Sequence, residues 1–233
     1  MNMAIIPARG GSKRIYKKNI REFCGKPMIV WSIEAALASA CFDHVMVSTD
    51  DDEIAEVAIA HGAAVPFRRP AELANDMAGT MPVIAHAIEW SIAQGLSVDY
   101  ACCIYATAPF VRAEDLVEGL NIIKATGSDY TFSVTSFPYP VQRALRINSD
   151  AHVEMLYPEL FNTRSQDLEE TFHDAGQFYW GKASAWQRST PIFLARSAPI
   201  VLPRYRVQDI DTLEDWESAE WLFRSMQARK RRD

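Results

Sequence analysis

Residues 5–19 decide the fold, and they read IIPARGGSKRIYKKN. The apolar run at residues 3–6 has the composition of a buried strand, and Pro7 ends it. Gly10 and Gly11 then allow the backbone to bend so that its amide N–H groups face an anion. Five cationic side chains stand at close spacing in this loop: Arg9, Lys13, Arg14, Lys17 and Lys18. We therefore predict a first strand that leads into a polyphosphate-binding loop, because so many cations disfavour the alternative of a solvated basic turn.

Two well-known phosphate-binding patterns do not fit this loop. The P-loop requires a glycine, four residues and then Gly-Lys-Ser/Thr, whereas Ser12 precedes Lys13 here. The dinucleotide fingerprint requires a third glycine that opens a helix, and the loop has two glycines. The predicted phosphate site is therefore of another kind.

Length and composition limit the class of protein. The chain has 233 residues, of which 48% are hydrophobic, so we expect one domain over residues 1–233 with a sizeable core. A net charge of −6 argues against a nucleic-acid partner. No apolar run approaches the roughly 20 residues that a membrane span needs, and the first residues lack the pattern of a signal peptide. The basic residues 229–232 are expected to form a solvated terminus rather than a binding patch.

The four cysteines favour a reducing compartment. Cys24, Cys41, Cys102 and Cys103 have no Cys-x-x-Cys spacing, and the adjacent pair lies in an apolar run. They are predicted to be buried thiols rather than disulfide partners or zinc ligands. A cytoplasmic location fits this use of cysteine.

The order of the predicted elements indicates an α/β fold. Helical spacing or helix-capping residues predict helices over residues 28–40, 53–61, 80–94, 112–125 and from Thr212 onward. Short apolar or β-branched runs predict strands over residues 44–49, 64–67, 100–105, 129–136, 176–180 and 204–210. Thr80, Thr212 and an aspartate of residues 50–52 are expected to cap helices. This alternation predicts a mainly parallel sheet with helices on both faces.

Residues 137–175 interrupt the alternation. Prolines recur at positions 138, 140 and 158, aromatic residues are frequent, and helical periodicity is lost. We interpret this segment as an excursion from the sheet, a hairpin with loops.

Three loops are expected to meet at one edge of the sheet. The basic loop, residues 106–109 and residues 209–211 each follow a predicted strand, and ligands of open parallel sheets lie beyond the carboxyl ends of the strands. Asp209 and Asp211 point to the same side of an extended chain and offer the hard oxygen ligands that Mg²⁺ prefers. The alternative is an exposed strand end before a capped helix, which the nearby basic loop disfavours.

The basic loop resembles the signature of the CMP-sugar nucleotidyltransferases, or cytidylyltransferases. That signature runs Ile-Pro-Ala-Arg, two residues, Ser-Lys, four residues and Lys-Asn, and the chain has every position from Ile6 to Asn19. The resemblance implies a Rossmann-like nucleotide-diphospho-sugar transferase fold and catalytic roles for Arg9, Lys13, Lys18 and Asp211. It implies that Asp209 and Asp211 hold Mg²⁺. It implies CTP contacts from Ala8, Arg9, Gly10, Ser12, Lys13, Lys18, Asn19, Thr107 and Ala108.

The chain departs from the family pattern at one loop. The family's cytosine-reading turn is usually Pro-Thr-Ser-Pro, and here Ala106 and Ala108 stand beside Thr107. Loss of the hydroxyl at position 108 would leave base recognition to backbone groups and Asn19.

Residues 139–143 and 172–180 resemble the branch of this family that activates pseudaminic acid, a nine-carbon 2-keto-3-deoxy sugar acid. Polar groups between aromatic rings suit a sugar acid, because rings cover apolar sugar faces and Arg forks onto a carboxylate. The predicted sugar contacts are Arg68, Arg69, Gln142, Arg143, Arg164, His173, Gln177, Phe178 and Tyr179. Arg68 and Arg69 are alternatively a surface ion-pair set with Asp76. His173 and Asp174 could form an acid–base pair, but a sugar-binding or structural role is favoured.

The resemblance implies transfer of CMP from CTP to the anomeric hydroxyl of pseudaminic acid, with release of pyrophosphate. It also implies a homodimer in which the excursion packs on the partner. Two alternatives stay open: the same chemistry on sialic, legionaminic or 3-deoxy-octulosonic acid, and a non-catalytic nucleotide-binding regulator.

Overall fold

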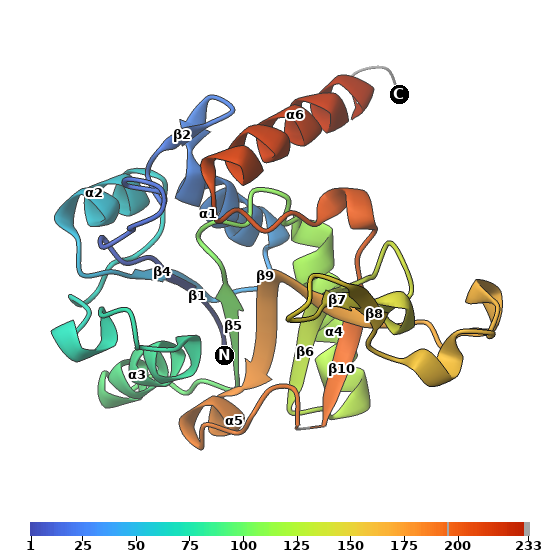
Figure 1. The fold of residues 1–233 in the computed structure, drawn as a ribbon. Helices are drawn as coiled ribbons and strands as arrows, with labels where there is room; N and C mark the ends of the chain where they lie inside the picture. Colours follow the sequence, from blue (N-terminus) through green and yellow to red (C-terminus); the bar gives the residue numbers. More distant parts are fainter. Residues whose placement is uncertain (195, 231–233) are drawn as a thin grey trace.

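The fold is organised around a six-stranded sheet. The computed structural model describes residues 1–194 and 196–230, so Arg231 and Arg232 of the basic tail lie outside the described residues. The strand order is β10-β6-β9-β5-β1-β4 (Figure 1). The strands are β1 (Asn2–Pro7), β4 (His44–Ser48), β5 (Tyr100–Ile104), β6 (Tyr130–Ser136), β9 (Phe172–Lys182) and β10 (Ser197–Val201).

The sheet is mostly parallel, as predicted, but β9 runs against its neighbours. The pairs β1–β4, β1–β5 and β6–β10 are parallel, whereas β9 is antiparallel to both β5 and β6. The chain leaves β6 after Ser136 and re-enters the sheet at Phe172, which pairs with Ser136. The chain re-enters the sheet at the end where β6 finishes and makes no crossover to the other end. For this reason β9 must run antiparallel to β6.

Helices cover both faces of the sheet because side chains alternate along each strand. Ile6 faces a core shared with α1 (Met28–Ser39), α2 (Asp52–Ala60) and α4 (Ala113–Thr126). Ile5 faces the opposite core, shared with α3 (Thr80–Ala93) and α5 (Ala183–Gln187). Full burial of both residues explains why the strand is a continuous apolar run rather than an alternating one.

A third apolar cluster joins the carboxyl edge of the sheet to the end of the chain. The long helix α6 (Leu213–Lys230) lies across this edge (Figure 1). Its Trp216 and Phe223 pack edge-on against Phe23, which belongs to the small hairpin of β2 (Glu22–Phe23) and β3 (Lys26–Pro27). Ile210 and Ile15 are buried in the same cluster. This packing brings residues 209–211 beside the basic loop.

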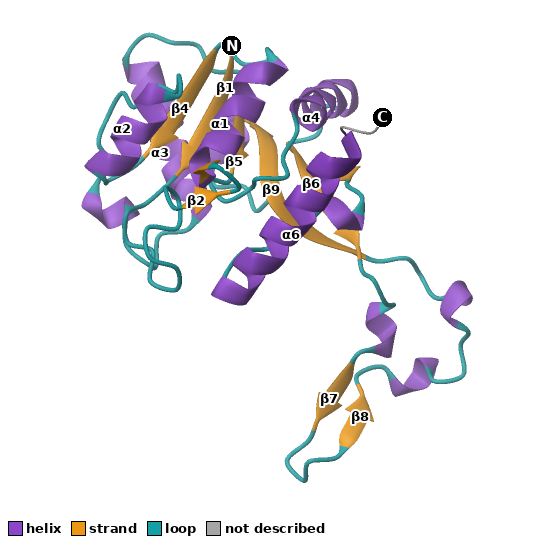
Figure 2. Ribbon diagram, turned by 90° about the horizontal axis from the view of Figure 1, so that it is seen from above, coloured by secondary structure: helices purple, strands orange, loops and turns teal. Residues whose placement is uncertain are grey.

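Residues 137–171 form an arm that extends from the body of the molecule (Figure 2). The arm contains the hairpin of β7 (Leu145–Ile147) and β8 (Val153–Met155), together with three single turns of 3-10 helix. The expected hairpin is confirmed. The excursion that we expected to end at residue 175 ends earlier, because β9 begins at Phe172.

Two strand predictions and one capping prediction are wrong. Residues 64–67 form only an isolated bridge from Ala64 to Met46, and residues 204–210 form a 3-10 turn and an irregular segment. The last strand is instead β10. Gly79, not Thr80, precedes α3, and the Thr80 hydroxyl lies 3.5 Å from the Tyr105 hydroxyl.

The other capping predictions are confirmed. The Asp51 carboxylate accepts a hydrogen bond from the Ile54 N–H at 3.0 Å, and the Thr212 hydroxyl accepts one from the Asp215 N–H at 3.2 Å. The four cysteines are free thiols, and Cys102 and Cys103 are fully buried, so burial raises the pKa of both. None of the described helices has the length and apolar character that crossing a membrane requires.

Candidate active site

A cleft of about 370 Å³ opens at the carboxyl edge of the sheet, where two of the three predicted loops, the basic loop and residues 106–109, meet the segment before α3. The basic loop contributes most of its wall, Thr107 comes from the turn after β5, and Asp76 comes from the segment before α3. The lining residues are Arg9, Ser12, Lys13, Arg14, Lys18, Asn19, Asp76 and Thr107. Six of these eight were predicted to bind or process a nucleotide.

Internal carboxylates pair with every cation of the basic loop. Asp76 accepts from Arg9 at 2.6 Å and also pairs with Lys13. Asp211 accepts from Arg14 at 2.7 Å and from Lys18 at 3.4 Å. The fifth cation, Lys17, pairs with Glu53. The positive charge of the loop is therefore balanced by carboxylates of the same chain.

Two amides at the glycine bend of the basic loop have partners within the protein. The Gly10 N–H donates to the Asp50 carboxylate at 3.0 Å, and the Ser12 N–H donates to the Gly10 carbonyl at 2.9 Å. The Gly10 N–H is therefore engaged within the protein, contrary to the expectation that it faces an anion. Glycine is needed at position 10 because a Cβ atom would lie 2.5 Å from an oxygen of Asp51. Gly10 thus shapes the loop and does not line the cleft.

A second cleft of about 180 Å³ shares two residues with the first, Asn19 and Thr107. Its wall also includes Tyr105, Gly79 and the buried Arg69. Arg69 donates to the Ser48 hydroxyl at 3.1 Å and to the Ser48 carbonyl. Burial lowers the pKa of Arg69 to about 10, so the guanidinium stays charged at neutral pH. A cationic cleft thus leads into a narrower one that is lined by polar groups and backbone.

The start of α6 fixes Asp211 beside the cleft. The Asp215 carboxylate accepts hydrogen bonds from the backbone N–H of Asp211 at 3.1 Å and of Thr212 at 2.8 Å. The hydrogen bond from the Thr212 hydroxyl, followed by these two backbone bonds, holds the pKa of Asp215 below its usual range. Ile210 is buried between two more exposed neighbours, Asp209 and Asp211, so both carboxylates are on the open side of the segment.

The donor set at Asp209 and Asp211 fits Mg²⁺. Mg²⁺ in nucleotide enzymes is usually bound by one or two carboxylates, with phosphate oxygens and waters completing the octahedron. Among the described residues no group of three or more His, Cys, Asp or Glu side chains could hold a metal without such help. Two carboxylates beside a cationic cleft therefore match this arrangement.

Three predicted sugar contacts on β9 lie in the interior. Phe178 is fully buried in the core that α4 covers, so the prediction that it faces a sugar is wrong. Gln177 is buried and donates to the Arg206 carbonyl. Tyr179 is buried with its ring 5.4 Å from that of Tyr105, and its hydroxyl donates to Asp174. Tyr179 supports the wall of the second cleft from behind rather than lining it.

Four more predicted sugar contacts lie in the arm or at its base. Gln142 donates to the Glu169 carbonyl at 3.0 Å, Arg143 donates to the carbonyls of Phe161 and Thr163, and Arg164 pairs with Asp167 at 2.7 Å. His173 lies at the base of the arm with its ring against Phe137. None of the four lines either cleft within the described part of the chain. Their roles as sugar contacts stay a prediction that would require a second chain.

Three further predicted site residues are absent from the lining of both clefts. Arg68 is exposed and pairs with Asp52, outside both clefts. Ala8 is buried, and its N–H continues the sheet by donating to the Ser48 carbonyl at 2.9 Å. Ala108 is also buried, whereas its neighbour Thr107 lines both clefts.

Arg14 and Asp76 line the cleft but were not among the predicted site residues. Arg14 could have been predicted from the sequence, because it belongs to the basic loop and stands among its other cations. Asp76 lies 67 residues from Arg9 in the chain, and only the tertiary fold places their charges together. Tyr105 lines the second cleft and was likewise not predicted. It lies two residues before Thr107 in the chain.

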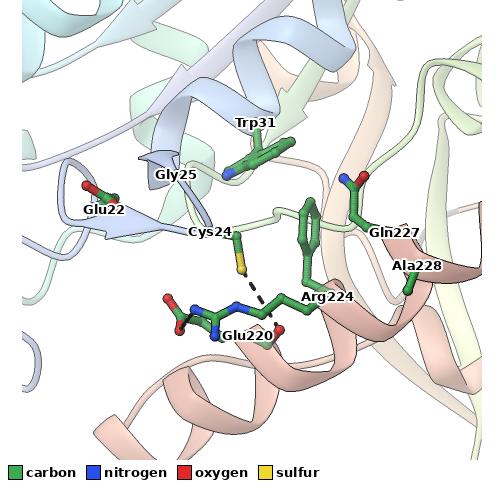
Figure 3. A pocket seen from close by; sticks show the side chains of 9 residues that line it. Glu22, Cys24, Gly25, Trp31, Glu220, Arg224, Gln227 and Ala228 are labelled. Atoms are coloured by element: carbon green, nitrogen blue, oxygen red, sulfur yellow. Dashed lines mark hydrogen bonds and ion pairs between the residues drawn. The ribbon is translucent and has the colours of Figure 1, made fainter. Parts of the chain in front are cut away.

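A larger cavity of about 520 Å³ lies elsewhere, between the β2–β3 hairpin and α6 (Figure 3). Trp31 and Phe223 form its apolar wall, and Glu220 pairs with Arg224 at its rim. It contains none of the predicted site residues. Its charged residues are Glu22 and the Glu220–Arg224 pair, with a single cation among them, so the smaller cleft with four cations is the better candidate for chemistry.

Comparison with known proteins adds independent findings. The family model described as Cytidylyltransferase matches residues 3–225. The chain is 45% identical over 223 residues to the pseudaminic acid cytidylyltransferase of Campylobacter jejuni serotype O:2, covering 96% of each chain. It is 31% identical to the CMP-N,N'-diacetyllegionaminic acid synthase of Legionella pneumophila, covering 95% of each.

The fold also has a close counterpart among solved structures. A structure of CMP:2-keto-3-deoxy-manno-octonic acid synthetase, complexed with CTP, superposes with a TM-score of 0.70 at 17% identity. The match covers 97% of this chain and 99% of that one. The predicted nucleotide-diphospho-sugar transferase fold is thus confirmed.

Proposed function

This chain belongs to the cytidylyltransferase family, and on that premise we propose that it transfers CMP from CTP to the anomeric hydroxyl of pseudaminic acid. The observation that carries the proposal is the cationic cleft, in which Arg9, Lys13, Arg14 and Lys18 converge beside the carboxylate of Asp211. A triphosphate presents several negative charges and suits such a site. Pyrophosphate is the second product.

The two adjoining clefts support binding of a whole nucleotide. The triphosphate would lie in the cleft of about 370 Å³ among the cations, and the nucleoside would lie in the cleft of about 180 Å³. Asn19 and Thr107 line both, so they would stand at the junction of phosphate and sugar. Arg69 offers a fixed donor deep in the second cleft, which suits the O2 acceptor of cytosine.

The chain's own residues account for most of the chemistry that the reaction needs. The sugar hydroxyl attacks the α-phosphorus in line with the departing pyrophosphate, and negative charge grows on the leaving oxygens. Arg9, Lys13 and Lys18 would hold those oxygens and offset the charge, because preorganised cations stabilise charge that develops in the transition state. Asp209 and Asp211 would hold Mg²⁺, which supplies further charge neutralisation and lowers the pKa of a bound hydroxyl.

The arm would serve a homodimer. Leu145, Ile147 and Val153 are all more than half exposed on one chain, which is unusual for apolar side chains that share one face of a hairpin. A second copy of the chain would cover them. The same contact would bring Arg143 and Arg164 near the partner's cleft, where their charge suits a sugar carboxylate.

The choice of acceptor rests on similarity. The relative from Campylobacter jejuni is 45% identical over nearly the full length of both chains, whereas the legionaminic acid synthase is 31% identical. Legionaminic, sialic and 3-deoxy-octulosonic acids remain alternative acceptors for the same chemistry. A non-catalytic nucleotide-binding role is disfavoured, because mere binding does not require two carboxylates placed beside the cations.

The decisive test measures pyrophosphate release with CTP and Mg²⁺ in the presence of each of the four acids at equal concentration. We expect the highest kcat/KM with pseudaminic acid. Faster release with another acid would keep the chemistry and replace the acceptor. CTP binding without release for any acid would favour the nucleotide-binding regulator.

A further inference from the structure

One carboxylate of the cleft occupies the place where an anionic ligand would bind. Asp76 accepts from Arg9 at 2.6 Å and also from Lys13, two of the cations assigned to the triphosphate. These two cations hold the pKa of Asp76 below its usual range, so it is ionised at neutral pH. A carboxylate between two cations is a short internal substitute for a phosphate group.

Asp76 differs from the other carboxylate of the cleft in how it is held. Asp211 stands at the start of α6, and bonds from its backbone to Asp215 and the burial of Ile210 fix its position. Asp76 lies in the irregular segment between Leu73 and Thr80. The segment's own bonds are local, since the Asn75 side chain accepts from the N–H groups of Met77 and Ala78 at 2.8 and 2.9 Å.

The surroundings of Asp76 allow it to leave the cleft without breaking the core. The Asp76 side chain is 44% exposed and Met77 is 92% exposed. The described contacts that hold the Asp76 carboxylate are those to Arg9 and Lys13. Ion pairs of this exposure are individually weak, so a ligand with several charges can replace them.

We propose that Asp76 is a built-in competitor for the triphosphate, which occupies the Arg9–Lys13 site in the free protein and leaves when the nucleotide binds. This inference rests on the proposed function. In the free state Asp76 keeps two cations paired and correctly spaced, and it lowers the apparent affinity for nucleoside triphosphates. The triphosphate gains the two cations but must displace a carboxylate that is already there.

The test compares ligand binding to the wild-type protein and to Asp76→Asn by calorimetry, without a sugar acceptor. The probes are CTP, inorganic pyrophosphate and cytidine. We expect Asp76→Asn to bind CTP and pyrophosphate about three- to tenfold more tightly, since two partly exposed ion pairs no longer compete. Cytidine carries no phosphate, so its affinity should not change.

Asp129→Asn is the matched control. Asp129 pairs with Lys182 at the opposite edge of the sheet, so the substitution makes the same change in net charge far from the cleft. Equal tightening by both variants would attribute the effect to net charge and overturn the proposal. Unchanged or weaker CTP binding to Asp76→Asn would also overturn it, as would equal tightening for cytidine. Failure of the wild-type protein to bind CTP would instead refute the proposed function.

Discussion

The cleft and the arm differ in whether their functional side chains have partners within the chain. In the cleft, the five cations of residues 9–18 are all paired with carboxylates of the same chain, on Asp76, Asp211 and Glu53. On the arm, Leu145, Ile147 and Val153 have exposed fractions of 60%, 75% and 64%. A cation can be paired with a carboxylate of its own chain and can still exchange that partner for a charged ligand. Apolar surface is removed from water only by contact with another surface. Within a single chain the charges of the cleft are therefore balanced, whereas the apolar side chains of the arm stay in contact with water.

The hairpin of the arm has two distinct faces. Leu145 pairs with Met155 and Ile147 with Val153, so these four residues share one face. Arg146 and Glu154 share the other face and form an ion pair at 2.9 Å. This pattern resembles a strand pair that is buried on one side, yet Leu145, Ile147 and Val153 on the apolar face are exposed.

The largest expected effect is at the cleft. Asp211→Ala should lower turnover roughly a thousandfold or more, because it removes a carboxylate that would hold the metal and two ion pairs that position Arg14 and Lys18. Its ion pairs are partly exposed, so the melting temperature should change little. Turnover and thermal unfolding measured on the same preparation check both statements. Near-normal turnover at saturating Mg²⁺ would remove Asp211 from the proposed metal site.

A smaller expected effect distinguishes Lys18, which lines the cleft, from Lys17, which does not. Lys18 lines the cleft and its side chain is only 15% exposed, whereas Lys17 pairs with Glu53 and is absent from the lining. Lys18→Ala should lower kcat/KM for CTP by roughly ten- to a hundredfold, since one charge-assisted contact to phosphate is lost. Lys17→Ala removes the same charge and serves as the control. Similar losses in both variants would mean that total charge, rather than the geometry of the cleft, governs CTP use.

A substitution on the arm should change the association of two chains rather than the folding of one chain. Ile147→Asp places a charge on the apolar face of the hairpin and should weaken association of two chains at least about tenfold, as a desolvated unpaired charge costs more than 1.4 kcal/mol. Sedimentation at several protein concentrations measures this change. Arg146→Gln, on the opposite face, should leave the association intact. A wild-type chain that stays monomeric at all concentrations would refute the role of the arm in a homodimer.

The local sequence pattern was sufficient to predict the helices and strands in which apolar side chains recur at a regular spacing. The apolar run before Pro7 is β1, the spacing in residues 28–40 is α1, and Thr212 caps α6 through Asp215. The irregular segment at residues 204–210 was misassigned because its buried residues, Arg206 and Ile210, serve packing and an ion pair to Asp115 rather than a strand. The aromatic segment of β9 was misjudged for a related reason: the same side chains can line a sugar site or fill a core, and only their neighbours distinguish the two.

The sequence by itself determined the basic loop, the alternation of strands and helices and the family to which the chain belongs, since each depends on residues close together in the chain. Only the tertiary structure decided that β9 is antiparallel, that Phe178 is interior and that Asp76 pairs with Arg9 and Lys13. These outcomes depend on which distant segments the topology brings together. The physical reason is that periodicity is a local property of the chain, whereas burial and charge pairing are properties of neighbours in space.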